Sequence, residues 1–311
     1  MPQPSRALDT GRKRLREQNW SDRMIKDILV GLDGSVYSDI ALQHGIALAK
    51  ACQATLHGLH VVDIVQVESP LLYDLAGATG AAPQLNLTTL MRENLELRGQ
   101  QLLTLFRQAC EADAVAYVEH LATGIVPAEI IRAAPEVDLV LVGRGGLHTG
   151  LSKALLGSAV ESVVRSGVKP TMVTAQSYAE IRKPLLATDG SRPAMAALSM
   201  AMVFALQLQL PLSVVYCDPT TSGSHEFLDA LQARVMDQGI PCEVDICRGN
   251  AHEDLVRYVE DHGHDLLFMG AFGHRRIVEW ILGSTTQYLL RASPVPLILC
   301  HGDPSASPPV T

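Results

Sequence analysis

The chain of 311 residues is poor in aromatic side chains, which make up 5% of it, and in charged side chains, which make up 19%. It contains no run of about twenty apolar residues, so the sequence predicts no membrane-spanning helix. The first 25 residues lack the apolar core of a secretory signal. We therefore expect a globular, cytoplasmic protein.

Cysteine is also scarce, with six residues at positions 52, 110, 217, 242, 247 and 300. Their spacing matches no zinc pattern, and most lie in apolar context, which favours reduced core residues. No set of histidines has a recognised ligand spacing, so we expect no metal site. The net charge of −8 argues against a nucleic-acid binder.

The usual catalytic signatures are missing. There is no Gly-x₄-Gly-Lys-Ser/Thr phosphate loop and no Gly-x-Ser-x-Gly elbow. Gly143 and Gly145 do not begin a dinucleotide fingerprint, because His148 stands where the third glycine belongs. The sequence therefore predicts no catalytic residue.

What the chain does contain is an internal repeat. Asp-Gly-Ser occurs at residues 33–35 and again at 189–191, while a later Gly-Ser pair occurs at 157–158 and again at 283–284. The spacing is shorter in the second copy, because the first copy has a longer middle. Each copy is the size of a domain, so we expect two tandem domains of one fold.

Strand-like and helix-like segments alternate in both copies, which predicts parallel sheets with helices on both faces. In the first copy the expected strands are 27–32, 55–62, 115–121, 139–143 and 171–174, and the expected helices are 36–52, 89–112, 126–134 and 155–166. In the second copy the expected strands are 185–188, 212–217, 243–247, 266–270 and 297–300, and the expected helices are 193–208, 225–238, 252–261 and 284–292.

These segments divide the chain into a basic arm at residues 1–25, a first domain at 26–176 and a second domain at 182–302. Residues 63–88 form a long, turn-rich stretch, a kind of segment that is usually functional or mobile when it occurs inside a compact domain.

The most informative motif lies in the second copy. Gly270-Ala-Phe-Gly273 follows an apolar strand, and nine further residues separate Gly273 from Gly283-Ser284, at the start of a helix. Glycines at a strand end let the backbone approach a ligand, and a helix start offers free N–H groups to an anion. Together they predict a cradle for a polyphosphate rather than simple turns.

This motif, its flanking segments and the Asp-Gly-Ser triplets resemble the universal stress protein family. The resemblance implies two adenine nucleotide alpha hydrolase-like α/β domains that bind ATP or another adenine nucleotide, with Mg²⁺ as a candidate companion. Asp189 would lie near the base and ribose, although capping a helix is an equally good interpretation of this residue. The basic residues after Gly273 fit either phosphate pairing or a solvated loop. The implied nucleotide-binding residues are Ala187, Asp189, Cys217, Met269, Gly270, Gly273, His274, Arg275, Gly283, Ser284 and Thr285.

The first copy departs from this pattern, because ten residues instead of nine separate its second glycine from Gly157. We therefore expect one tight nucleotide site per chain, in the second domain. The candidate second site comprises Asp33, Val61, Gly143, Gly146, Gly157 and Ser158.

The resemblance implies a nucleotide-responsive regulator or protective factor in the stress response, with slow ATP hydrolysis as an open alternative. The competing hypothesis is a scaffold or sensor subunit that binds no nucleotide and acts through protein partners. The last strand of each copy follows a proline and suits a sheet edge. We therefore predict that strands 171–174 and 297–300 pair within one chain, with a homodimer of chains as a weaker expectation.

Overall fold

The computed structural model describes residues 24–67, 84–146, 157–216, 224–247, 253–271 and 283–302. Most of the predicted basic arm lies outside these ranges. The strands are β1 (Asp27–Gly31), β2 (Thr55–Asp63), β3 (Tyr117–Gly124), β4 (Leu139–Val142), β5 (Thr171–Val173), β6 (Pro184–Thr188), β7 (Leu212–Tyr216), β8 (Cys242–Ile246), β9 (Leu266–Gly270) and β10 (Leu297–Cys300). The helices are α2 (Val36–Cys52), α3 (Ile64–Val67), α5 (Gln84–Ala112), α6 (Val126–Ala133), α7 (Ser158–Ser166), α8 (Arg192–Leu208), α9 (Ser224–Met236), α10 (Glu253–Asp261) and α11 (Ser284–Ala292).

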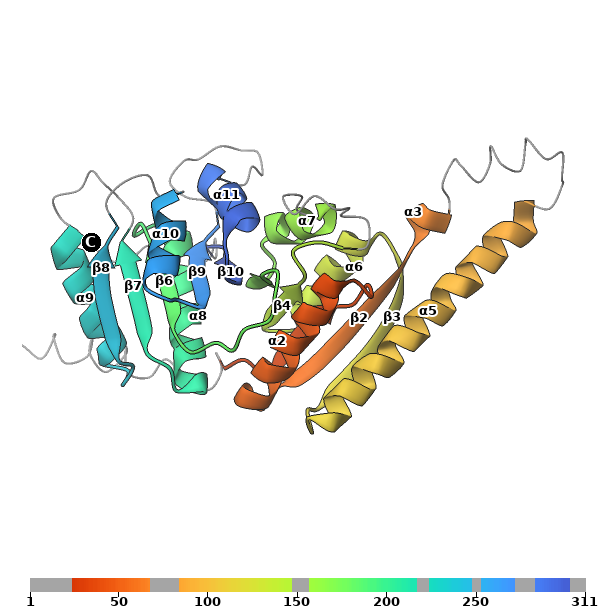
Figure 1. Ribbon diagram of the computed structural model, residues 1–311, viewed down its shortest axis with the longest axis horizontal. Coiled ribbons are helices and arrows are strands. Elements are labelled where there is room, and N and C mark those ends of the chain that lie inside the picture. The colour runs from red at the N-terminus through yellow and green to blue at the C-terminus, as the bar shows by residue number, and fades with distance from the viewer. Residues whose placement is uncertain are drawn as a thin grey trace, which may run out of the picture.

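These strands form one sheet, in the order β3-β2-β1-β4-β5-β10-β9-β6-β7-β8 (Figure 1). Neighbouring strands are parallel within each half of the sheet. The second half has the same strand order as the first when both are read from the outer edge inward. The predicted α/β fold with two tandem, doubly wound parallel-sheet domains is therefore confirmed.

Helices cover both faces of the sheet, which explains why inner strands such as β4, β9 and β10 are almost continuously apolar. The edge strands β3 and β8 alternate more polar and exposed residues. Buried residues of α2, α5, α8 and α9 belong to one hydrophobic cluster, and those of α6, α7, α10 and α11 belong to another. On β1, Ile28 and Val30 face the first cluster and Leu29 faces the second. The five described cysteines are buried in these two clusters.

The two halves also begin and end their first helices in the same way. The side chains of Ser35 and Ser191 cap α2 and α8 by accepting a hydrogen bond from a backbone N–H of the first turn. The residue that follows each helix is a glutamine, Gln53 or Gln209, in the left-handed conformation with φ of 55°. The repeat in the sequence is therefore also a repeat of local structure.

The two domains join through their last strands. β5 and β10 pair antiparallel, with Val173 opposite Leu297 and Met172 opposite Ile298. This confirms the predicted pairing within one chain. Because neither strand is left as an open edge at the junction, the sheet continues from one domain into the other.

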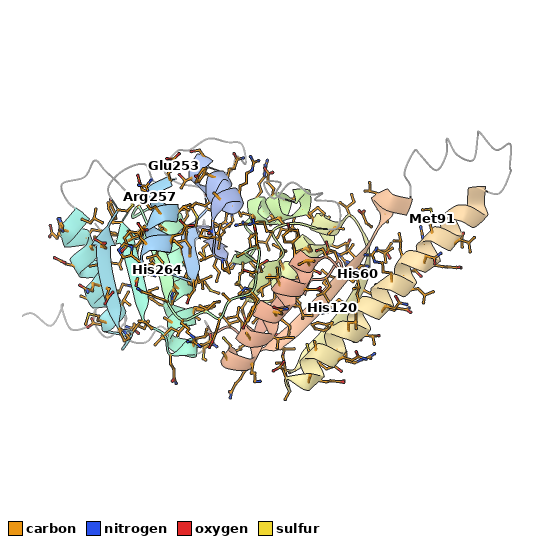
Figure 2. The ribbon with its side chains drawn as sticks, viewed as in Figure 1. His60, Met91, His120, Glu253, Arg257 and His264 are labelled. Carbon is orange, nitrogen blue, oxygen red and sulfur yellow. The ribbon has the colours of Figure 1, made fainter. Side chains whose placement is uncertain are left out.

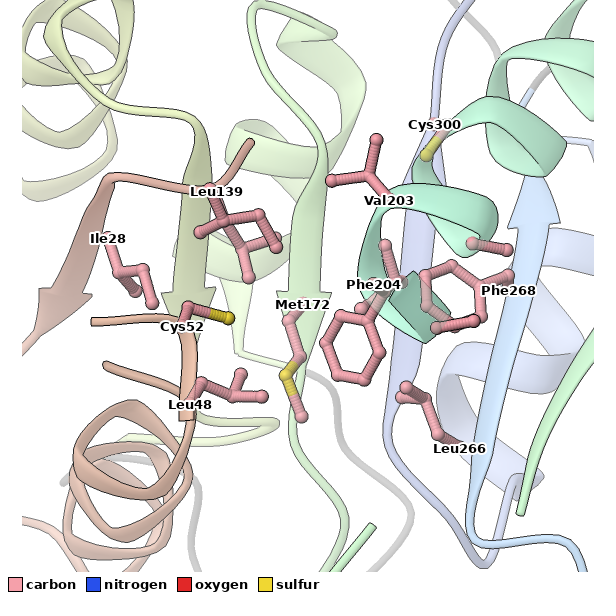
Figure 3. Close-up of a cluster of buried hydrophobic side chains, with 14 of the residues drawn as sticks. Ile28, Leu48, Cys52, Leu139, Met172, Val203, Phe204, Leu266, Phe268 and Cys300 are labelled. Atoms are coloured by element: carbon pink, nitrogen blue, oxygen red, sulfur yellow. The ribbon is translucent and has the colours of Figure 1, made fainter. Parts of the chain in front are cut away.

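The hydrophobic core is also continuous across the junction. Met172 of the first domain lies between Leu139 on one side and Phe204 and Phe268 of the second domain on the other (Figure 3). The rings of Phe204 and Phe268 meet edge to face with their centroids 5.4 Å apart. Each half of the chain is long enough for a core of its own, but both clusters contain residues of the two halves.

A glutamine side chain adds a polar link between the domains. In α8, Gln207 accepts a hydrogen bond from the Ile25 backbone N–H at 2.8 Å and donates one to the Ile25 carbonyl at 3.1 Å. We expect Gln207→Ala to lower the free energy of unfolding by about 1–2 kcal/mol, because two partly buried hydrogen bonds are lost. Urea unfolding measures this, with exposed Gln43→Ala on α2 as the control. Equal stability of the two variants would contradict the prediction.

The segment between β2 and β3 differs from the prediction in its boundaries. Residues 64–67 form the short helix α3, and α5 begins at Gln84 rather than at residue 89. The long α5 slants across the sheet, and its first turns project beyond the strands (Figure 1). Gly99 lets α5 approach the sheet, because a Cβ there would lie 2.6 Å from the ring of His60. β3 runs from Tyr117 to Gly124, so it begins and ends later than predicted.

Candidate functional site

Each domain has a switch point where the strand order reverses, between β1 and β4 in the first domain and between β6 and β9 in the second. Ligands of such sheets bind outside the carboxyl ends of the strands at this point. The chain leaves β1 toward Asp33 and β4 toward Gly143, and it leaves β6 toward Asp189. The predicted site residues are therefore placed at the switch points by the topology itself.

In the first domain a cavity of about 640 Å³ opens at the switch point. This volume lies within the usual range for small-molecule sites. Its wall contains five of the six residues named for the candidate second site, namely Asp33, Val61, Gly143, Gly146 and Gly157. The sixth, Ser158, is the first residue of α7, and its side chain lies outside the described residues.

The carboxylate of Asp33 shapes the turn that links β1 to α2. Its Oδ1 accepts a hydrogen bond from the Ser35 backbone N–H at 2.8 Å. In the second domain, Asp189 Oδ1 accepts from the Ser191 N–H at 2.9 Å. The helix caps are therefore the serines, and each aspartate supports the turn that presents its carboxylate at the switch point.

The first glycine of each predicted phosphate loop has a packing role. A Cβ at Gly143 would lie 2.7 Å from the backbone of Tyr37 in α2. A Cβ at Gly270 would lie 2.5 Å from the backbone nitrogen of Ala194 in α8. Only glycine lets these strand ends lie so close to the helix start. This packing accounts for Gly143 and Gly270 without reference to a ligand.

The later glycines of the first-domain loop lie against the cavity. A Cβ at Gly146 would come within 2.8 Å of Asp33 Oδ2, so the loops after β1 and β4 approach each other closely there. Gly157 N–H donates to the carbonyl of Arg144 at 3.1 Å, which ties the start of α7 to the same loop. No side chain caps α7, and its first turn lines the cavity through Ala159 and Val160. The start of this helix thus presents backbone N–H groups and a positive dipole end to the cavity.

His60 of β2 also lines the cavity, next to these loops. Its Nδ1 lies 2.7 Å from the Leu32 carbonyl, so Nδ1 carries the proton of the neutral ring and links β2 to the end of β1 (Figure 2). Burial lowers the pKa of His60, and the nearby positive charge of Arg98 lowers it further. At neutral pH the cavity therefore contains a neutral imidazole.

Sequence reasoning missed the wall that α5 contributes. Leu95 and Arg98 line the cavity from this helix, and Asp63 lines it from the end of β2. The helical spacing of Leu95, Arg98 and Leu102 places these residues on one face of α5, and this spacing could have indicated the contribution of the helix to the cavity. The guanidinium of Arg98 and the side chain of Leu102 lie over Gly34, next to Asp33.

The described part of the second-domain site matches this plan. Ala187 and Met269 are buried neighbours in register on β6 and β9, at positions equivalent to Gly31 and Val142 of the cavity wall. Gly283 is the N-cap residue of α11 and, having no side chain, makes no capping hydrogen bond. Ser284 and Thr285 form its first turn. Cys217, Gly273, His274 and Arg275 lie outside the described residues.

The region around the end of the second strand differs between the domains. Tyr216 occupies the position of His60, and its ring lies 5.7 Å from that of Phe227 in α9. Phe227 also lies 3.6 Å from where a Cβ of Gly190 would be. An aromatic pair therefore replaces the imidazole and guanidinium of the first domain.

Arg144 connects the first-domain loop to the second domain. Its side chain is buried, and Nη2 donates to the carbonyl of Ser293, just after α11, at 2.6 Å. Burial lowers the pKa of the guanidinium, and among the described residues Nε has no hydrogen-bond partner. Arg144 of the first domain thus contacts the carboxyl end of α11, and the amino end of the same helix carries the Gly283-Ser284 motif.

Comparison with known proteins agrees with this architecture. The sequence model of the Universal stress protein family matches residues 24–175 and 180–301. Universal stress protein Slr1230 of Synechocystis is 28% identical over 284 residues, which cover 88% of this chain and 99% of that protein. Universal stress protein MJ0531 of Methanocaldococcus jannaschii is 29% identical over 161 residues, which cover 51% of this chain and 87% of that protein.

The fold also matches a solved structure. The crystal structure of a universal stress protein from Archaeoglobus fulgidus superposes with a TM-score of 0.72 at 21% identity, covering 89% of this chain and 98% of that one. In the described part of the chain, no helix has the length and apolar character needed to cross a membrane. The two matches of the family model, together covering most of the chain, show that this protein belongs to the universal stress protein family and carries its domain twice.

Proposed function

We propose that the chain binds ATP or another adenine nucleotide and responds to it as a regulatory or protective factor. The observation that carries the proposal is the convergence, on one cavity of about 640 Å³, of a carboxylate at the end of β1 and glycines from the loop after β4. These residues are more than a hundred positions apart in the sequence. The family resemblance implies the adenine base.

The two ends of the cavity suit the two ends of a nucleotide. Val61, Ile130 and Val142 offer apolar contacts to a base, and the Asp33 carboxylate accepts hydrogen bonds from an amine or a hydroxyl. The loop from Gly143 to Gly146 and the start of α7 offer backbone N–H groups to phosphate oxygens. Arg98 adds a positive charge from α5.

We place the tighter site in the second domain, because its glycines have the spacing of the family motif. The support from the structure is the repeated plan: an aspartate that supports its turn, a strand-end glycine packed on the helix, and an uncapped helix after Gly283. The first-domain loop is one residue longer, and we expect that cavity to bind nucleotide more weakly.

The simplest test is to identify and measure the ligand. Nucleotide extracted from the purified full-length chain is identified by mass spectrometry, and calorimetry with ATP and GTP gives affinity and stoichiometry. We expect adenine nucleotide, a preference for ATP, and one tight site per chain. If no nucleotide binds, the scaffold hypothesis takes the place of this one. Two equal sites would contradict the assignment to the second domain.

Asp189→Asn tests the carboxylate without removing the turn. The asparagine oxygen can still accept from the Ser191 N–H, whereas the charge that favours an amine or ribose hydroxyl is lost. We expect ATP affinity to fall about tenfold, or about 1.4 kcal/mol, because a charge-assisted hydrogen bond becomes a neutral one. Asp33→Asn is the matched control in the first domain, and the tight site should keep its affinity in that variant. Equal effects of the two substitutions would contradict the prediction.

A further inference from the structure

A cluster of two histidines and an aspartate lies where β1 and β2 begin and along the neighbouring stretch of β3. Asp27 begins β1, and His57 lies near the start of β2. His120 lies on the edge strand β3, where Figure 2 labels it. In the β2–β3 register His120 stands opposite Leu59, and His57 lies two residues before Leu59 on the same strand. Both histidines therefore lie on the face of Leu59, which belongs to the cluster under α6 and α7. His120 is exposed, and Val118 beside His57 is 39% exposed. Solvent therefore reaches the cluster.

The hydrogen bonds of the cluster determine how His57 is protonated. Its Nε2 lies 2.9 Å from Asp27 Oδ1, and its Nδ1 lies 3.1 Å from His120 Nε2. Because a carboxylate only accepts, Nε2 of the neutral ring must carry the proton. Nδ1 then presents its lone pair toward His120. The aspartate thus orients an electron pair toward a second imidazole.

We propose that His57 and His120 form a binding site for a divalent late transition-metal ion, with Asp27 orienting His57. Imidazole nitrogens are suitable ligands for zinc, copper and nickel. A histidine that donates its other ring N–H to a carboxylate is the usual arrangement at such metals, because the carboxylate fixes the tautomer and makes the ligand more basic. This site is independent of the nucleotide proposal.

The separation of the two nitrogens fits one bound ion. With metal–nitrogen bonds of about 2.0–2.1 Å, two ligands at a right angle lie about 2.9 Å apart and two at a tetrahedral angle about 3.35 Å apart. The observed 3.1 Å lies between these values. In the metal-free chain His120 Nε2–H donates to His57 Nδ1. Binding therefore requires the His120 proton to move to Nδ1 and the lone pairs of both rings to turn toward the ion.

The number of protein ligands determines how tightly the site would bind a metal ion. Among the described residues no group of three or more candidate ligands converges on an ion, so water would complete the coordination. We therefore expect moderate affinity, with Cu²⁺ bound more tightly than Zn²⁺.

The test uses the full-length chain and the metal alone. Calorimetry with Zn²⁺ gives the affinity, and electron paramagnetic resonance with Cu²⁺ counts the coordinating imidazoles by their nitrogen hyperfine splitting. We expect two imidazoles in the native chain and one in His120→Gln, with Zn²⁺ affinity at least tenfold lower. Asp27→Asn should weaken Zn²⁺ binding about 10–100-fold while leaving both imidazoles in place. Exposed His225→Gln on α9 is the matched control and should bind Zn²⁺ as the native chain does.

Two results would overturn the proposal. One is the absence of Zn²⁺ and Cu²⁺ binding by the native chain at micromolar to millimolar metal. The other is binding that His120→Gln and His57→Gln leave unchanged, which would place the ion on other residues. Because His120 lies exposed on an edge strand, its replacement should leave the thermal unfolding curve unchanged, so lost binding would not reflect lost folding.

Discussion

Replacing Gly283 by valine is expected to abolish tight nucleotide binding while leaving the fold intact. Gly283 has φ of −58° and ψ of 149°, a backbone conformation that valine adopts readily, and no described atom lies within 4 Å of where its Cβ would be. The branched side chain would instead occupy space in front of the α11 N–H groups, where the phosphates are proposed to bind. We expect ATP affinity to fall at least a hundredfold, or about 2.8 kcal/mol, in calorimetry.

The first domain provides a matched control for this variant. Gly157 precedes α7 with similar angles, and a Cβ there would make ordinary contacts of 3.6 Å with Gly145 and Val160. Gly157→Val should therefore also fold, and it should reduce only the weaker binding in the first domain. If Gly283→Val folds with full ATP affinity, the proposed cradle is wrong. If only Gly157→Val loses tight binding, the main site is in the first domain.

Acidification below pH 6.5 is expected to destabilise the fold through buried histidines at the junction. His44 of α2 is 1% exposed, and its ring lies 4.8 Å from that of Tyr178 between the domains. Burial lowers the pKa of His44 to about 4, and it lowers the pKa of His301 after β10 to about 4 as well. In the unfolded chain these side chains have their ordinary pKa of about 6.5.

The direction of this pH effect follows from the number of protons that the folded and unfolded chains bind. Between pH 6.5 and 4 the unfolded chain takes up a proton at His44 that the folded chain does not, so the free energy of unfolding falls as the pH falls. The decrease is about 1.4 kcal/mol per pH unit, or about 3 kcal/mol in total for His44. Urea unfolding at several pH values measures it.

His44→Phe isolates this contribution, because phenylalanine keeps a ring against Tyr178 but cannot be protonated. We expect its unfolding free energy to depend less on pH than that of the native chain, by about one proton between pH 6 and 4.5. Exposed His225→Gln should keep the native pH dependence. Identical slopes for His44→Phe and the native chain would show that burial of His44 has no part in acid unfolding.

The two domains are repeats in fold but differ around the switch point. His60 and Arg98 border the first-domain cavity, whereas the tilted rings of Tyr216 and Phe227 lie side by side at the equivalent place in the second domain. Arg144 reaches from the first-domain loop to the end of α11, and its counterpart in the second domain is the buried Ala271. We therefore expect substitutions at equivalent positions to have unequal effects in the two domains.

The sequence by itself determined the repeat, the α/β class and the strand ends at which the candidate site is proposed. Apolar runs such as Leu139–Val142 are too short and too uniformly apolar for exposed helices, and they alternate with helical segments, which leaves parallel sheets as the only solution that buries them. Where the strand order reverses, the first and fourth strands of a domain are neighbours. The residues that follow these two strands therefore lie close together. Asp33 and Gly143 could therefore be predicted to converge without coordinates.

Only the tertiary structure decided what depends on contacts between distant segments. The strand-end glycines turned out to be needed by the helix starts at Tyr37 and Ala194, which no local pattern reveals. The α5 wall of the cavity and the His57–His120 pair depend on which face of a strand or helix meets which neighbour. The shared core arises because β5 and β10 pair antiparallel, so each domain completes the hydrophobic layer of the other. Such contacts are set by packing across the whole chain, and the sequence around each residue carries no record of its partner.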